Sequence, residues 1–115
     1  SAAVRVDQVI SAGRGGVISV FQAEAITPLP QDYFGAPIPP HTDSVFIAWH
    51  GQSGRVARLW EFRGAAGPPA RLDRFEGRLA LLLGGHDVSF GGQRLTPSHS
   101  EFVHLLVFAD PESLQ

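Results

Sequence analysis

The segment that most constrains the fold runs from Thr42 to Arg63, where two apolar runs flank a short Gly-Gln-Ser-Gly stretch. The first run alternates between two sets of residues: Val45, Ile47 and Trp49 against Phe46, Ala48 and His50. In the second run we expect one face to carry Val56, Trp60 and Phe62, and the other to carry Leu59 and Glu61. A period of two on both sides of a glycine-bearing turn is typical of a β-hairpin. The segment therefore predicts a β protein.

Other segments share this strand character: Val4–Ile10, Val17–Ile26, Leu72–Leu83, His86–Phe90 and Phe102–Phe108. Within the second of them, Ile18, Val20 and Ile26 would share one face, and Phe21 and Ala23 the other. Glu76-Gly77 would divide the third into two strands, Gly91-Gly92 would form a turn, and the last is apolar enough to be buried on both faces. We predict an all-β fold, a small antiparallel barrel or sandwich of about six to eight strands.

The segment from Thr27 to His41 holds five of the nine prolines. Proline fixes φ and removes a backbone donor, so this segment is expected to form neither a central strand nor a long helix. We expect at most one short helical turn here, over Gln31–Phe34 after Pro30.

Composition narrows the class of protein. At 115 residues we expect residues 1–115 to form a single β domain. The longest apolar run is too short to span a membrane, and the absence of cysteine removes disulfides and thiolate chemistry. A net charge of −2 argues against nucleic acid as a partner.

The histidines and serines are the residues that could form a metal or nucleophile site in this chain. His99 and Glu101 would share a face of a strand, whereas His104 would point the other way, so no ligand set forms. Gly51-Gln52-Ser53-Gly54 is one residue short of a nucleophile elbow and sits in a hairpin turn. We therefore expect no catalytic residue, no metal, no cofactor and no enzymatic activity.

An arginine–aromatic surface is the remaining candidate. Arg58 would share a face with Trp60, and Arg55 and Arg63 would lie opposite. We interpret the tryptophans as core residues and the arginines as their rim.

Several segments, read in order, suggest a family: Gly15–Phe21, Leu29–Tyr33, Ser44–Arg63, His86–Phe90 and Glu101–Ala109. Over residues 13 to 111 this series resembles the C-terminal part of the protruding domain of calicivirus major capsid proteins, most like those of noroviruses. The resemblance implies the inner subdomain of that domain, with a translation-factor-like barrel whose helix opens at Leu29–Tyr33. It also implies a structural role in the virion, at the capsid surface, with self-association as a homodimer and a host glycan or receptor as a further partner.

The chain departs from that family in places. Pro37, Pro39 and Pro40 cut the helical segment short, and Gly64–Arg74 is inserted. Where some noroviruses have a glycan-binding Ser-Gly-Tyr loop, this chain has Glu76-Gly77-Arg78. The candidate interface or ligand contacts are accordingly Arg58, Trp60 and Arg78, with the loop at 36–40.

Two other readings stay open. All nine basic residues are arginine, as in proteins from GC-rich genomes, so the chain would also suit a secreted or periplasmic β-sandwich binding module of a GC-rich bacterium. A jelly-roll domain encoded upstream would separate a capsid protein from such a module. A histidine-based metalloenzyme would need His86 or His99 for its activity.

Overall fold

The computed structural model describes residues 4–13, 16–23, 31–39, 41–65, 70–76, 78–86, 88–94 and 101–108. Every regular element within these residues is a β-strand, and none of them is helical, which confirms the predicted all-β class. Seven of the described strands have five or more residues, and four have two or three. All the strand pairs are antiparallel.

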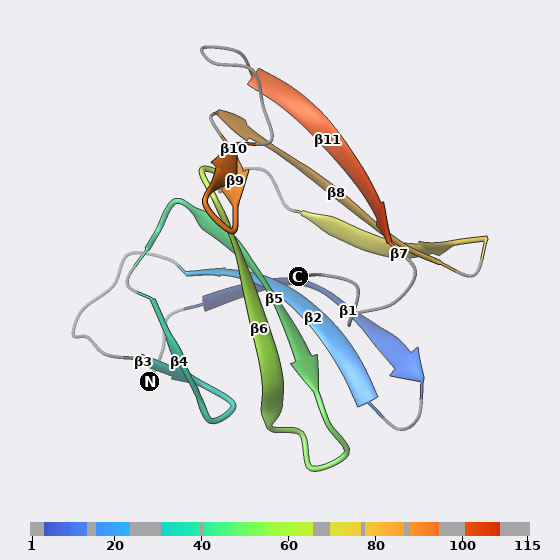
Figure 1. Ribbon diagram of the computed structural model, residues 1–115. Coiled ribbons are helices and arrows are strands. Elements are labelled where there is room, and N and C mark those ends of the chain that lie inside the picture. The colour runs from blue at the N-terminus through green and yellow to red at the C-terminus, as the bar shows by residue number, and fades with distance from the viewer. Residues whose placement is uncertain are drawn as a thin grey trace.

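The strands form a main sheet, a second sheet and a small hairpin (Figure 1). The main sheet has the order β1-β2-β5-β6-β9-β10, with β1 (Val4–Gly13), β2 (Gly16–Ala23), β5 (Ser44–His50), β6 (Val56–Arg63), β9 (Ser89–Phe90) and β10 (Gln93–Arg94). The second sheet has the order β11-β8-β7, with β7 (Arg71–Phe75), β8 (Arg78–His86) and β11 (Glu101–Phe108). The hairpin pairs β3 (Gln31–Tyr33) with β4 (Ala36–Ile38).

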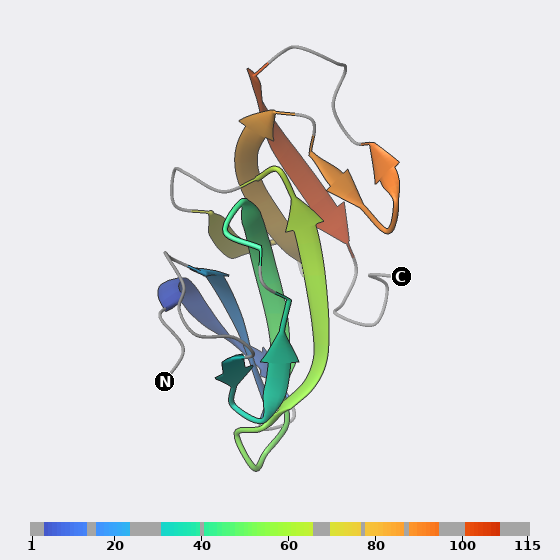
Figure 2. The same ribbon diagram turned by 90° about the vertical axis from the view of Figure 1, so that its left-hand side faces the viewer.

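The central strands β2, β5 and β6 of the main sheet, which Figure 2 shows in a second view, bury side chains on both faces. One face packs on the second sheet in a cluster that includes Ile18, Val20, Val45, Ile47, Trp60, Phe62, Leu72, Leu79, Leu81 and Leu83. The other face packs under the β3–β4 hairpin in a cluster of Phe21, Ala23, Tyr33, Ile38, Phe46 and Ala48. The predicted division of β2 is thus confirmed for the residues that the structure describes, and Ile26 lies outside them.

The predicted hairpin of residues 42–63 is β5–β6, but one side chain was assigned to the wrong face. The register pairs Trp49 with Arg58 and His50 with Val56, so Ala57 is an extra residue in β6. Such a β-bulge reverses the alternation beyond it. Val56 therefore packs with Leu59 against the cluster under the hairpin, and not with Trp60 and Phe62.

At most one helical turn was expected over Gln31–Phe34, and none forms there, because residues 31–33 are a strand. Tyr33 pairs with Ala36, which leaves Phe34 and Gly35 as a two-residue loop with φ values of 46° and 87°. Positive φ at both loop positions is the type I′ geometry that suits the twist of a hairpin. The ring of Tyr33 then stacks on Phe21 at 3.9 Å, which buries the hairpin against the main sheet. As expected, the proline-rich segment contributes no central strand among its described residues.

The C-terminal half follows the prediction with one shift. Leu72–Leu83 is divided into β7 and β8 at Glu76, which has a φ of 50°. Residue His86 ends β8, so the strand expected over His86–Phe90 is reduced to β9. Gly91-Gly92 is a turn, and Phe102–Phe108 lies within β11, whose side chains fall outside the described part.

One carboxylate joins β1 to the entrance of the second sheet. The β1–β2 register shifts between Val6 and Gln8, which leaves Asp7 as the bulged residue. Its carboxylate accepts hydrogen bonds from Arg5 Nε at 2.8 Å, Gln22 Nε2 at 2.8 Å and the backbone amide of Ala70 at 3.0 Å. The side chain of Asp7 is only 2% exposed.

Candidate functional site

The structure brings together two of the three predicted contact residues. The Arg58 guanidinium lies 5.0 Å from the centre of the Trp60 ring. Trp60 is 6% exposed and belongs to the core, so the pair offers no aromatic face for a ligand. Arg78 is exposed at the start of β8, in the other sheet. The interpretation of Trp60 as core with an arginine at its rim is confirmed.

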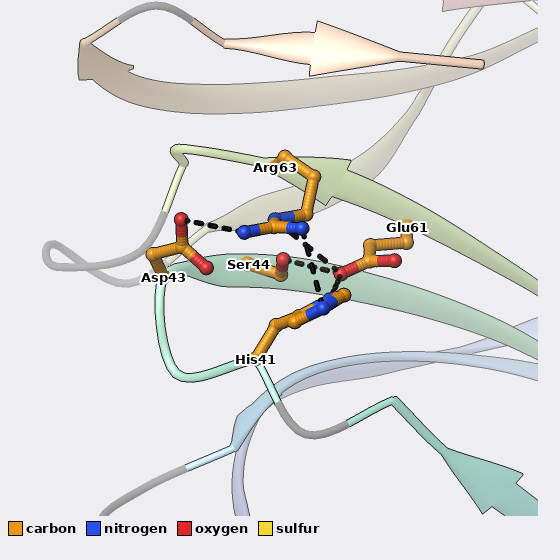
Figure 3. Close-up of polar contacts among 5 residues, drawn as sticks. All are labelled: His41, Asp43, Ser44, Glu61 and Arg63. Carbon is orange, nitrogen blue, oxygen red and sulfur yellow. Dashed lines mark hydrogen bonds and ion pairs between the residues drawn. The ribbon is translucent and has the colours of Figure 1, made fainter. Parts of the chain in front are cut away.

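A half-exposed polar cluster lies where β5 begins and β6 ends (Figure 3). Glu61 Oε2 accepts hydrogen bonds from Ser44 Oγ at 2.6 Å and from His41 Nδ1 at 2.5 Å. Arg63 reaches His41 Nε2 at 3.2 Å and Asp43 Oδ2 at 3.4 Å. The β5–β6 register sets this arrangement, since it pairs Ser44 with Arg63 and places Glu61 two residues before Arg63.

The geometry of this cluster fits a structural role. Arginine is always a donor, so His41 Nε2 accepts from Arg63, and His41 Nδ1 is the nitrogen that donates to Glu61. Ser44 donates to Glu61 and not to the histidine, and its side chain is fully buried. A serine nucleophile would need the histidine as its base. The cluster instead fastens the 41–44 segment to β6.

A second polar network is buried under the β3–β4 hairpin. His50 Nδ1 lies 2.9 Å from the Gly54 carbonyl oxygen, and His50 Nε2 lies 2.8 Å from Ser19 Oγ. Ser19 Oγ is also 2.9 Å from the Tyr33 hydroxyl. In a neutral imidazole the Nδ1 proton goes to the carbonyl, so the Ser19 hydroxyl donates to Nε2 and Tyr33 donates to Ser19. Every side chain in the network is then satisfied.

This network anchors the hairpin to the main sheet. Ser19, Tyr33 and His50 are all buried, and burial raises the pKa of Tyr33 above its ordinary 10.0, against a smaller opposing effect from the Ser19 hydrogen bond. Although serine and histidine are in contact, the other imidazole nitrogen faces a carbonyl and the pair is sealed from solvent. The sequence did carry one signal for it: His50 alternates onto the same face as Phe46 and Ala48, where a histidine needs polar partners.

An exposed apolar strip runs along β1 and β2. Val6, Val9 and Val17 are 45%, 57% and 38% exposed. They lie on the face covered elsewhere by the β3–β4 hairpin, because Val6 is paired with Phe21, Val9 with Ser19 and Val17 with His50. We call these three residues the valine strip.

The described part of the chain was also predicted to lack a metal site and a membrane-spanning segment, and the following observations bear on these two points. No three histidine, aspartate or glutamate side chains there are placed to share a metal ion. The side chain of His86, and those of His99 and His104, lie outside it. No helix among the described residues has the length and apolar character that crossing a membrane requires.

No known protein family, curated protein or solved structure matches this chain. The calicivirus resemblance therefore stays a prediction, and the helix that it implied at Leu29–Tyr33 is wrong for residues 31–33.

Proposed function

We propose that this chain is a non-catalytic β-sandwich module that acts through protein–protein contact, as a building unit of a larger assembly. The valine strip is the observation that carries the proposal. Contiguous exposed apolar side chains on a sheet face mark contact surfaces, because exposing apolar surface to water in a monomer costs free energy. A second copy of the chain is the expected occupant, in agreement with the expected homodimer.

The polar clusters support the same view. Both histidines at these sites form hydrogen bonds that join elements of the fold: His41 bonds to Glu61, and His50 bonds to Ser19. The outer surface is therefore the part of the described molecule available for function. A rigid sandwich held by such clusters suits a module that presents surfaces to partners.

The specific form of the proposal is a capsid module of the calicivirus type, displayed on a virion and self-associating as a dimer. Its support is the ordered series of strand segments, from which the segment 31–33 departs because it is a strand and not the start of a helix. A jelly-roll domain encoded immediately upstream would favour it. The alternative is a secreted or periplasmic binding module, which a strongly exposed aromatic side chain at one end of the sandwich, Phe34, favours.

The strip is tested by sedimentation velocity of the full chain between about 10 µM and about 1 mM. The parent protein is expected to dimerise within this range, and Val9→Lys to remain monomeric, because an ammonium group on an edge strand blocks close apolar contact. Leu82→Lys is the matched control, since Leu82 is equally exposed as Val17 but lies on β8. A monomeric parent, or a Val9→Lys variant that dimerises like the parent, would contradict the proposal.

A further inference from the structure

Two turns meet at one end of the sandwich. The β3–β4 loop presents Phe34 and Gly35, and the β5–β6 turn presents Arg55. The Val56 amide donates to the Phe34 carbonyl at 2.9 Å, which fixes the two turns together. Both views of the ribbon place the β3–β4 loop beside the start of β6 (Figures 1 and 2). We call Phe34, Gly35 and Arg55 the turn tip.

Phe34 is an unfavourable residue for its position. Its φ of 46° lies in the left-handed region, where asparagine, aspartate and glycine are preferred in a type I′ loop. Its side chain is also 61% exposed. The Phe34 ring makes T-shaped contacts with the rings of Tyr33 and His50, at 4.8 Å and 5.2 Å between ring centres. Part of the Phe34 ring therefore covers the buried network. The larger, exposed part of the ring does not cover this network.

Arg55 supplies a positive charge next to Gly35, the residue that follows Phe34. A Cβ added at Gly35 would lie 2.6 Å from an Arg55 terminal nitrogen, so the guanidinium rests directly on the glycine. Among the described residues, no carboxylate pairs with that guanidinium. The two adjoining turns therefore present a phenylalanine and an arginine, and both residue types are enriched in protein–protein interfaces.

We propose that the turn tip binds an acidic segment of a different protein, with Phe34 entering an apolar pocket of that partner and Arg55 pairing with a carboxylate at its rim. Arginine and carboxylate form two parallel hydrogen bonds, which would orient the partner on the ring. Charge complementarity selects this occupant. A second copy that used the same turn tip would bring another Arg55 to the contact, where the two guanidinium groups would repel each other. A nucleic acid is disfavoured because it binds through several phosphate contacts, and the tip supplies one arginine.

The test uses a phage-displayed library of random peptides about twelve residues long, selected on the full chain. Enriched peptides are expected to combine aspartate or glutamate with a large apolar residue. Their affinity, measured by fluorescence anisotropy, should fall at least about tenfold with Phe34→Asn and with Arg55→Gln. Leu82→Asn and Arg71→Gln, exposed positions on the second sheet, serve as matched controls and should bind like the parent.

Further measurements separate this inference from a structural role and from the valine strip. Thermal midpoints of both tip variants should stay within about 5 °C of the parent, so that lost binding is not lost folding. Val9→Lys should keep peptide binding, whatever its effect on dimerisation. The proposal would be overturned if the selection did not enrich acidic peptides, or if Arg55→Gln bound them as well as the parent does. It would also be overturned if dimerisation depended on Phe34, or if the turn tip bound a uridine oligonucleotide in place of the peptides.

Discussion

Asp7 gives the sharpest test of how the two sheets are joined, through the variant Asp7→Ala. The carboxylate is 2% exposed and accepts three hydrogen bonds, one of them from the backbone amide of Ala70. Ala70 is itself buried, at the entrance to β7. Removing the carboxylate therefore leaves an amide with no acceptor in a place that water reaches poorly.

The size of the effect follows from the three donors taken separately. An unsatisfied buried amide at Ala70 costs about 1–3 kcal/mol, and the bond lost by the buried Gln22 side chain about 1.5–3 kcal/mol, because its acceptor is charged. Arg5 is 40% exposed, so its ion pair adds at most about 1 kcal/mol. Together these losses should lower the free energy of unfolding by about 2.5–7 kcal/mol. For a domain of this length that lowers the thermal midpoint by about 10–28 °C.

Urea unfolding followed by the fluorescence of the two tryptophans measures this difference. Asp43→Ala is the matched control, because Asp43 is an exposed aspartate that pairs, among the described residues, with Arg63 at 3.4 Å. It should cost no more than about 1 kcal/mol. If Asp7→Ala unfolds within about 1 kcal/mol of Asp43→Ala, the carboxylate does not hold β1 to the second sheet, and the reasoning fails.

Two further variants test the buried network and the contact between the sheets. The pKa of Tyr33 is raised, so the folded protein should lose stability as pH rises above about 10, where the unfolded chain ionises first. Because Tyr33 is the only tyrosine, phenolate absorbance reports on it alone and should titrate at higher pH in the native protein than in urea. Tyr33→Phe should remove the dependence of stability on pH in this range. Equal titration midpoints in the native and unfolded protein would contradict the burial of Tyr33. A Cβ at Gly85 would lie 2.1 Å from the Gly64 carbonyl oxygen, so Gly85→Ala should lose about 2 kcal/mol or more in urea unfolding. A Cβ added at Gly51 has no neighbouring atom within 4 Å, so Gly51→Ala should change stability by about 0.5 kcal/mol or less. Similar losses of stability in Gly85→Ala and Gly51→Ala would refute the close approach of Gly85 to Gly64.

The sequence predicted what depends on alternation. Ile18 and Val20 fall on one face of β2, and Phe21 on the other, because a strand has a period of two and both faces are buried. Val56 was misplaced because a bulge at Ala57 shifts the period, and an alanine between valine and arginine carries no mark of a bulge. Alternation therefore fixes faces only up to the first irregularity.

The hairpin at residues 31–38 was missed for a different reason. A two-residue type I′ loop is normally marked by Asn-Gly or Asp-Gly, whereas here the loop is Phe34-Gly35. With the turn concealed, Pro30 suggested the start of a helix instead. The partners of His50 were equally hidden, because Ser19 and Tyr33 are distant in sequence and meet it only after β2, β3 and β5 assemble.

The residue that concealed the hairpin is also the one with least reason to be there on structural grounds. Asparagine at position 34 would suit the loop backbone better, and a smaller side chain would leave less apolar surface in water. Sites where a local rule is broken without a gain inside the fold are expected to be functional. Phe34 breaks two such rules beside an arginine that has no acidic partner among the described residues. The failure of the sequence prediction at this loop and the inference of a binding surface there thus rest on the same phenylalanine.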